Sequence, residues 1–139
     1  MKIEEFKAAD YQEVYALWAE TGISLLASDE YAEIMKFQQR NGDSFLVGRD
    51  EATGRIMAVC MGGFDGRRGY IHHLAVKPEF QRKGYGREIL ERVMAGLKKK
   101  GALKVHLFIE SRNSGVVDFY GNSGWTRRND LIVMSKALQ

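Results

Sequence analysis

The sequence predicts a mixed α and β fold, of the α/β class with a mixed (α+β) sheet, and three observations support this. Apolar residues recur at three- and four-residue spacing over residues 84–100, which is the period of an amphipathic helix. Apolar runs at residues 44–49, 55–64 and 70–76 are separated by glycine-containing turns, which is typical of successive hairpins. No repeat or linker-like stretch interrupts the 139 residues, so we expect one domain over residues 1–139.

Shorter elements come before the hairpins. Residues 2–7 alternate weakly and predict a first strand. Asp10 and Glu13 are spaced like a capping box at the start of a helix that ends near Gly22. Ser28 or Asp29 is then expected to cap a second helix, which the pair Asn-Gly at residues 41–42 ends.

The second half of the chain adds a crossover. Residues 104–109 alternate as a strand after the predicted helix, so this strand and residues 70–76 should be parallel neighbours. A short helix is expected after residue 113. The last element predicted is a C-terminal strand over residues 125–136, entered through Gly124.

The segment between the third apolar run and the long helix has the pattern of an anion-binding loop. Gly84 and Gly86 permit a tight turn and a close approach of the backbone to a ligand. The first amides of the helix that follows lack partners within the helix and carry the positive end of its dipole. A phosphate or pyrophosphate fits such a site, although glycines at this place also occur in plain structural turns.

Charge and cysteine content restrict the function. A net charge of +3 is too small to indicate nucleic-acid binding and is compatible with a small anionic ligand. Three lysines, residues 98–100, precede Gly101 and are read as favourable charge at a helix C-terminus. The one cysteine, Cys60, lies in an apolar run and predicts a buried side chain in a reducing compartment. With no apolar leader and no long apolar run, we expect a cytoplasmic protein that does not enter the membrane.

Three pieces in one order make a family resemblance visible. They are Leu74-Ala75-Val76, then Gln81-x-x-Gly84-x-Gly86, and then Asn113 followed by Phe119-Tyr120-x-x-x-Gly124-Trp125. At this spacing the chain resembles, over essentially its whole length, the GNAT superfamily of acetyl-CoA-dependent N-acetyltransferases. The phrase at residues 61–69 and the Pro-Glu-Phe of residues 78–80 are most similar to those of small bacterial stand-alone members of the YpeA type.

The resemblance implies a cosubstrate, acetyl-CoA, and no metal. The main chain of Leu74, Ala75 and Val76 would bind the pantetheine arm as an added strand does. The loop amides would bind the pyrophosphate, with nearby basic groups adding charge; the residues are Gln81, Arg82, Lys83, Gly84, Tyr85 and Gly86. Asn113 would contact the pantetheine arm, or serve as a helix N-cap, or both.

The resemblance also implies catalytic roles. Tyr120 would protonate the departing thiolate as a general acid, and His72 is favoured as the general base, with His73, Glu110 or water as alternatives. Because neighbouring strand residues face opposite sides, only one of the two histidines is expected to face the substrate. The acceptor would be a primary amine of a small molecule or peptide, which the sequence does not identify, and a homodimer is possible. A non-catalytic acyl-CoA-binding module is the alternative function.

Overall fold

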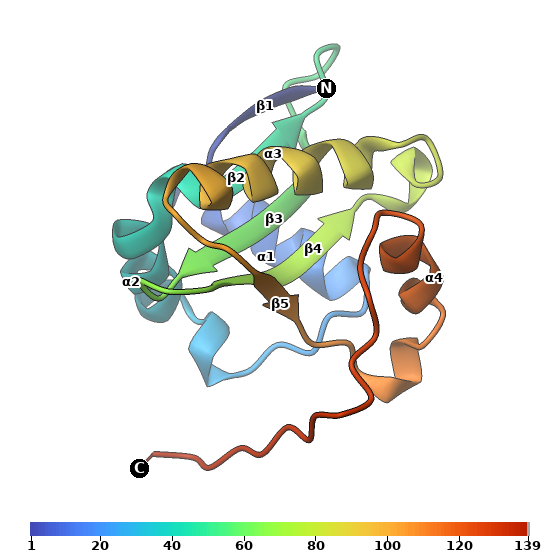
Figure 1. The fold of residues 1–139 in the computed structure, drawn as a ribbon. Coiled ribbons are helices and arrows are strands. Elements are labelled where there is room, and N and C mark those ends of the chain that lie inside the picture. Colours follow the sequence, from blue (N-terminus) through green and yellow to red (C-terminus); the bar gives the residue numbers. More distant parts are fainter. Residues whose placement is uncertain (139) are drawn as a thin grey trace. The chain divides into compact units, whose positions relative to one another are not determined.

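The computed structural model describes residues 1–138, and the chain divides into two units, Met1–Phe108 and Ile109–Gln139. The first unit holds a five-stranded sheet in the order β1-β2-β3-β4-β5 (Figure 1). Neighbouring strands are antiparallel except for the parallel pair β4 and β5, as the predicted crossover requires. The strands are β1 (Lys2–Glu5), β2 (Phe45–Arg49), β3 (Ile56–Phe64), β4 (Gly69–Val76) and β5 (Val105–Leu107).

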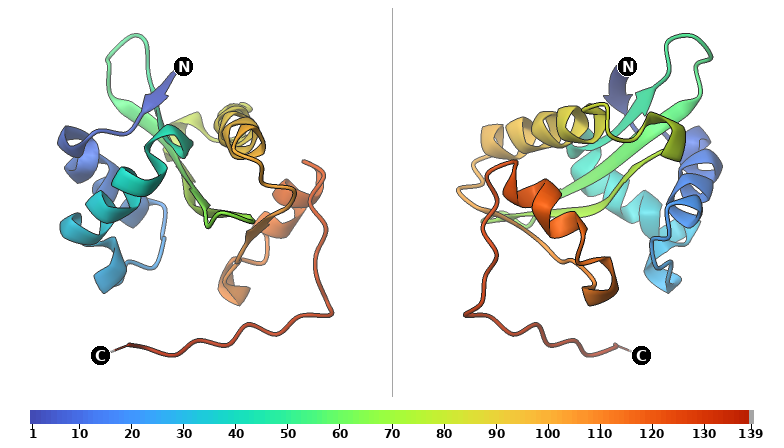
Figure 2. Two further views of the ribbon diagram at one scale, coloured as in Figure 1. Left: turned by 60° about the vertical axis from the view of Figure 1, so that its left-hand side comes forward. Right: turned by 90° about the vertical axis from the view of Figure 1, so that its right-hand side faces the viewer.

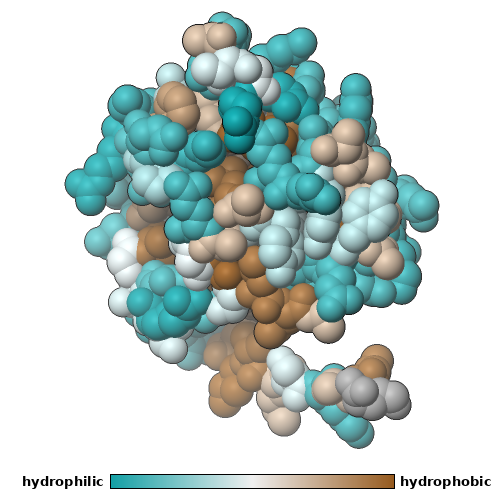
Figure 3. Space-filling model, turned by 180° about the vertical axis from the view of Figure 1, so that it is seen from behind, coloured by the Kyte–Doolittle hydropathy of each residue, from teal (hydrophilic) through white to brown (hydrophobic). Residues whose placement is uncertain are grey.

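Three helices of the first unit cover the sheet: α1 (Tyr11–Glu20) and α2 (Tyr31–Asn41) lie on one face, and α3 (Tyr85–Lys99) lies on the other (Figure 2). Trp18 and Ile34 pack from α1 and α2 against Val47 and Val59 of the sheet, and all four are buried. Viewed from the side of α1 and α2, the surface is largely hydrophilic with apolar residues between (Figure 3). The five-stranded sheet with helices on both faces confirms the predicted mixed α and β fold.

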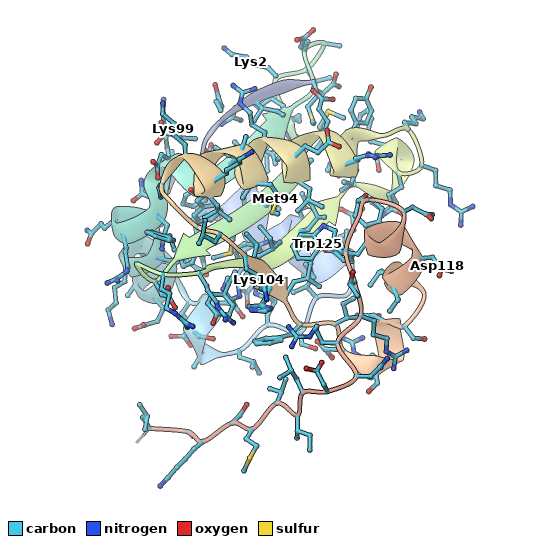
Figure 4. The ribbon with its side chains drawn as sticks, in the orientation of Figure 1. Lys2, Met94, Lys99, Lys104, Asp118 and Trp125 are labelled. Atoms are coloured by element: carbon cyan, nitrogen blue, oxygen red, sulfur yellow. The ribbon has the colours of Figure 1, made fainter. Side chains whose placement is uncertain are left out.

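Helix α3 follows the predicted amphipathic pattern. Its apolar stripe is buried against the sheet, while Lys99 in the last turn is exposed and projects from the helix (Figure 4). The stripe approaches β3 so closely that a β-carbon on Gly62 would lie 2.4 Å from Val93 Cγ1. Gly101 follows the helix with φ of +105°, as a C-terminal glycine does. None of the helices in residues 1–138 is both long and apolar enough to cross a membrane.

Strand β4 carries a β-bulge. Met61 pairs with His72 and Val59 pairs with Ala75, so two residues of β4, His73 and Leu74, lie opposite Cys60 alone. His73 has φ of +48°. The bulge interrupts the alternation of side chains that the sequence predicts, because the extra residue shifts which face each later side chain occupies.

Strands β4 and β5 pair over a short distance only. The parallel ladder joins residues 69–71 of β4 to Val105–Leu107, and no strand of the described chain pairs with residues 72–76 on that side. On the opposite side the same stretch pairs with β3. The second half of β4 therefore has one unpaired edge within the sheet.

The starts of the first two helices differ from the predictions. Asp10 makes no side-chain cap on α1, and Glu13 binds Arg55 and the amide of Ile56 instead of closing a capping box. Glu30, not Ser28 or Asp29, is the N-cap of α2. Asp10 and Asp29 each accept a local amide in the 3-10 turn before the helix, from Lys7 and Leu26, and each also binds a distant side chain.

The second unit contains α4 (Val116–Gly121), and the predicted C-terminal strand is wrong. Residues 125–138 hold no strand, and the sheet comprises β1 to β5 alone. Apolar side chains of this segment remain 55–90% exposed: Leu131, Ile132, Val133 and Met134. Strand propensity is not sufficient here, because an isolated strand leaves its backbone groups without partners in a sheet.

Candidate functional site

The loop between β4 and α3 is built to turn sharply. After the 3-10 turn Pro78–Phe80, the chain reaches Gly84, the N-cap of α3, with φ of +90° in the left-handed region that glycine adopts without strain. Arg82 also has a positive φ, of +62°. Gly86, predicted as a second turn residue, instead lies in the first turn of α3.

The backbone amides of this loop are the main feature of the site. The backbone amides of residues 82–87 donate no hydrogen bond to any acceptor in residues 1–138. On either side of this run, the Gln81 amide donates to the carbonyl of Pro78 and the Glu88 amide donates to the carbonyl of Gly84. Six consecutive amides thus carry unused donors at the N-terminus of a fifteen-residue helix. Such donors, together with the positive end of the helix dipole, bind phosphate groups.

Side chains around the loop are mostly exposed. Arg82 and Lys83 are exposed, and the Lys83 ammonium lies 6.0 Å from the Phe80 ring centre. Arg87 binds Glu91 with 3.1 Å between Nε and Oε1, so its charge is partly balanced within α3. The Phe80 and Tyr85 rings meet edge to face at 6.2 Å.

The loop is connected to the unpaired edge of β4. Gln81 donates from Nε2 to the carbonyl of Val76 at 2.9 Å, which places the start of the loop beside the end of the strand. Leu74, Ala75 and Val76 lie in the stretch that β3 pairs on one side only. Main-chain groups on an open strand edge can bind an extended ligand as a further strand would. The structure thus brings together the two segments that were predicted to bind the cofactor.

Both histidines of β4 contact residues from the same face of the sheet. The ring of His72 lies edge to face against Phe37 of α2 at 5.9 Å, and that of His73 lies against Trp18 of α1 at 5.0 Å. The prediction that adjacent histidines face opposite sides is therefore wrong, because the bulge and the positive φ at His73 break the strand alternation.

His72 is exposed and makes no hydrogen bond to the described residues. Desolvation by the surrounding protein, followed by the charge of His73, lowers its pKa, and Asp29 opposes this shift. Such a histidine is uncharged at neutral pH and can accept a proton.

His73 has a partner that sequence reasoning missed. Its Nε2 lies 2.7 Å from Asp29 Oδ1, across 44 positions of the sequence. Asp29 had been predicted as a helix cap, and no local pattern indicates a partner so distant. Trp18, which packs against the His73 ring, is fully buried.

The second unit holds Asn113 and Tyr120. Asn113 is exposed and ends a 3-10 turn, and the N-cap of α4 is Gly115, so the predicted capping role of Asn113 is wrong. The Tyr120 ring is half-buried and packs edge to face against Phe119 at 5.0 Å and Trp125 at 5.7 Å. Glu110, the other proposed base, binds Arg112 at 2.8 Å.

A strand edge that is open along the second half of β4, with unpaired helix N-terminal amides at the end of that strand, is an arrangement suited to an extended, phosphate-bearing ligand. The model of the acetyltransferase (GNAT) family matches residues 11–125, and the chain therefore belongs to this family of acetyltransferases.

Individual relatives agree with this assignment. The chain is 31% identical over 120 residues to Acetyltransferase ECA0875 of Pectobacterium atrosepticum, which covers 86% of this chain and 84% of the relative. Among solved structures, Ard1 from Thermoplasma volcanium matches with a TM-score of 0.78 and 21% identity, over 90% of this chain and 82% of that chain. Glucosamine-6-phosphate N-acetyltransferase from Arabidopsis thaliana matches with a TM-score of 0.70 and 23% identity, over 99% and 98%.

Proposed function

We propose that this protein is an acetyl-CoA-dependent N-acetyltransferase that acts as a single domain. It transfers the acetyl group to a primary amine of a small molecule or peptide by direct attack in a ternary complex. The observation that carries the proposal is the run of six unpaired amides, residues 82–87, beside the open edge of β4. The unpaired amides can donate hydrogen bonds to the pyrophosphate of acetyl-CoA, and the open edge of β4 can pair with its pantetheine arm.

The binding residues in this proposal are those of the predicted site. The main chain of Leu74, Ala75 and Val76 holds the pantetheine arm, and Asn113 adds a contact to it. The loop amides receive the pyrophosphate, and exposed basic side chains add screened positive charge; the loop residues are Gln81, Arg82, Lys83, Gly84, Tyr85 and Gly86.

Bound acetyl-CoA supplies a thioester, which a neutral amine attacks directly while a backbone amide near residues 74–76 stabilises the oxyanion. In our proposal His72 takes the proton that the amine must lose, directly or through water, and its desolvated, uncharged ring supports this role. Tyr120 gives its phenolic proton to the departing thiolate. A covalent acyl-enzyme on Cys60 plays no part, because that thiol is buried and desolvation raises its pKa.

The first test is the thermal unfolding midpoint with acetyl-CoA, CoA or NAD. A ligand at about 100 times its Kd stabilises the folded state by about 2.7 kcal/mol, so acetyl-CoA and CoA should each raise the midpoint and NAD should not. If neither CoA compound raises the midpoint at about 1 mM, which corresponds to weak binding, the proposal fails.

Binding alone does not separate an enzyme from a non-catalytic acyl-CoA-binding module. Thiol release from acetyl-CoA should therefore be measured with a panel of amines, for the wild type and for Tyr120→Phe and His72→Gln. We expect each variant to lower kcat by about 100-fold or more while CoA binding persists, because general acid and base groups contribute on this scale. Binding with no amine-dependent thiol release would favour the binding module.

Two further parts of the proposal concern assembly and location. We propose the cytoplasm as the compartment, since one buried thiol suits a reducing environment. A homodimer is compatible with the proposal and can be measured by light scattering at several protein concentrations.

A further inference from the structure

A histidine–carboxylate pair joins the segment before α2 to the bulge of β4. Asp29 Oδ1 lies 2.7 Å from His73 Nε2, and the side chains are 9% and 23% exposed. A carboxylate only accepts hydrogen bonds, so Nε2 carries the hydrogen in this contact.

The pair is held from several directions. The second carboxylate oxygen of Asp29 accepts the amide of Leu26 at 3.0 Å, and the Asp29 carbonyl accepts the Tyr11 hydroxyl at 2.8 Å. The Trp18 indole donates to the carbonyl of His73 at 3.3 Å. Helix α1 and the segment before α2 are thereby both attached to the bulge.

The backbone at His73 requires such support. Among residues 1–138, His73 and Arg82 are the only non-glycine residues with positive φ. This conformation costs about 1–3 kcal/mol for a residue with a side chain and persists where the surroundings determine it, often at functional sites. Arg82 lies in the phosphate-binding loop, and His73 lies between His72 and the main chain of residues 74–76.

The bulge determines the direction in which the side chain of His72 and the residues that follow it in β4 point. Because two residues of β4 oppose Cys60, His72 keeps its ring toward Phe37, and the strand re-enters its ladder with β3 at Ala75. A regular strand would shift the pairing by one residue and turn the following side chains to the other face. The positions of the proposed base, His72, and of the main chain proposed to bind the pantetheine arm therefore depend on the backbone at His73.

We propose that Asp29 and His73 form a positioning pair, which holds the bulge of β4 so that His72 and the main chain of residues 74–76 keep the geometry that acetyl transfer requires. In its catalytic part the inference rests on the proposed function. Neither residue is assigned a contact with the reacting atoms; both act through the backbone of β4.

The kinetic test uses Asp29→Ala and His73→Ala, each compared with the wild type. We expect kcat to fall by about 100-fold in each, because a misplacement of about 1 Å can cost this much. The apparent Kd for CoA should rise by a smaller factor than kcat falls, because the main chain of residues 74–76 is misplaced while the loop amides are held separately. The double variant should lose no more than either single variant, because the first substitution already breaks the contact.

Two further variants separate positioning from folding. His73→Gln can still donate from its amide to Asp29, so it should recover about tenfold or more of the activity lost in His73→Ala. Glu13→Ala is the matched control, because Glu13 is also a carboxylate that ties α1 to the sheet, at Ile56 N. That variant should lose stability and retain kcat. A loss of kcat in Glu13→Ala as large as in Asp29→Ala would contradict a specific positioning role.

A measurement independent of activity completes the test. Hydrogen exchange at the amides of residues 72–76 should be faster by about tenfold or more in Asp29→Ala than in Glu13→Ala, since local opening sets this rate. His73→Ala, which removes the same contact from the other side, serves if Asp29→Ala does not fold. Equal exchange in the Asp29 and Glu13 variants, or full kcat without the pair, would overturn the inference. A wild type without any transfer activity would instead refute the proposed function, while the exchange rates would still decide whether the pair holds the bulge.

Discussion

Single residues in this protein take roles that their sequence neighbours do not indicate. Asp29 and Glu13 are both predicted to take part in helix caps, and both bind groups more than 40 positions away in the sequence, at His73 and at Arg55 with Ile56. Asp29 in addition accepts the local amide of Leu26. Carboxylates near a helix start have this freedom because either a local amide or a distant donor satisfies them.

At Cys60 the sequence and the structure agree, and a labelling experiment can test both. The thiol is fully buried, and desolvation raises its pKa, so little thiolate forms at neutral pH. We expect no reaction with an aromatic disulfide reagent in the native protein and one equivalent of labelling in guanidinium chloride. Rapid native labelling would mean that β3 opens locally. The result also decides whether thiol release from CoA can be read without background.

Substitution of two glycines by alanine should change the stability of the protein in opposite directions. A β-carbon at Gly62 would meet Val93 Cγ1 at 2.4 Å and Ser44 O at 3.0 Å, so Gly62→Ala should destabilise the protein by about 1–3 kcal/mol. At Gly96, inside α3, the nearest atoms would lie at 3.6 and 3.7 Å, and Gly96→Ala should stabilise by about 0.5–1 kcal/mol. Urea unfolding measures both. If Gly62→Ala is neutral, α3 and β3 are less tightly packed than the structure has them.

At the scale of elements, the crossover from β4 through α3 to β5 follows directly from periodicity and glycine placement. Residues 84–100 predicted the long helix, and the structure has Tyr85–Lys99. Gly84 was predicted to allow the turn before it and has φ of +90°. The sequence pattern did not predict the length over which β4 and β5 pair, because strand pairing depends on the packing of helices on both faces of the sheet.

Helix α1 is tied to β3 by a carboxylate whose titration should be visible in stability. Desolvation raises the pKa of Glu13, but hydrogen bonds from Arg55 and from the Ile56 amide outweigh it, and the pKa lies below its ordinary value. A lowered folded-state pKa gives stability that is present above the unfolded value, about 4.3, and lost as pH falls through the folded value. Glu13→Gln should therefore cost about 1 kcal/mol at pH 7, and the difference from the wild type should shrink toward pH 3. A constant difference from pH 7 to pH 3, measured by urea unfolding, would contradict this assignment.

For the whole molecule, hydrogen exchange should separate the sheet from the C-terminal segment. Strand β3 is central and pairs on both sides, whereas residues 125–138 form neither helix nor strand and expose their apolar side chains. We expect the slowest exchange in β3 and the fastest in residues 126–138, because exchange follows local opening. Protection of residues 131–134 that increases with protein concentration would show that this segment forms a strand on self-association.

The sequence by itself determined the mixed α and β class, the crossover, the glycine turn before α3 and membership in the acetyltransferase family, because periodicity, glycine placement and motif spacing are local properties. The tertiary structure decided the bulge at His73, the shared face of His72 and His73, the Asp29–His73 contact and the absence of a strand at residues 125–136. Each of these depends on which distant group satisfies a backbone or side-chain donor. That choice is made by packing, and local sequence does not record it.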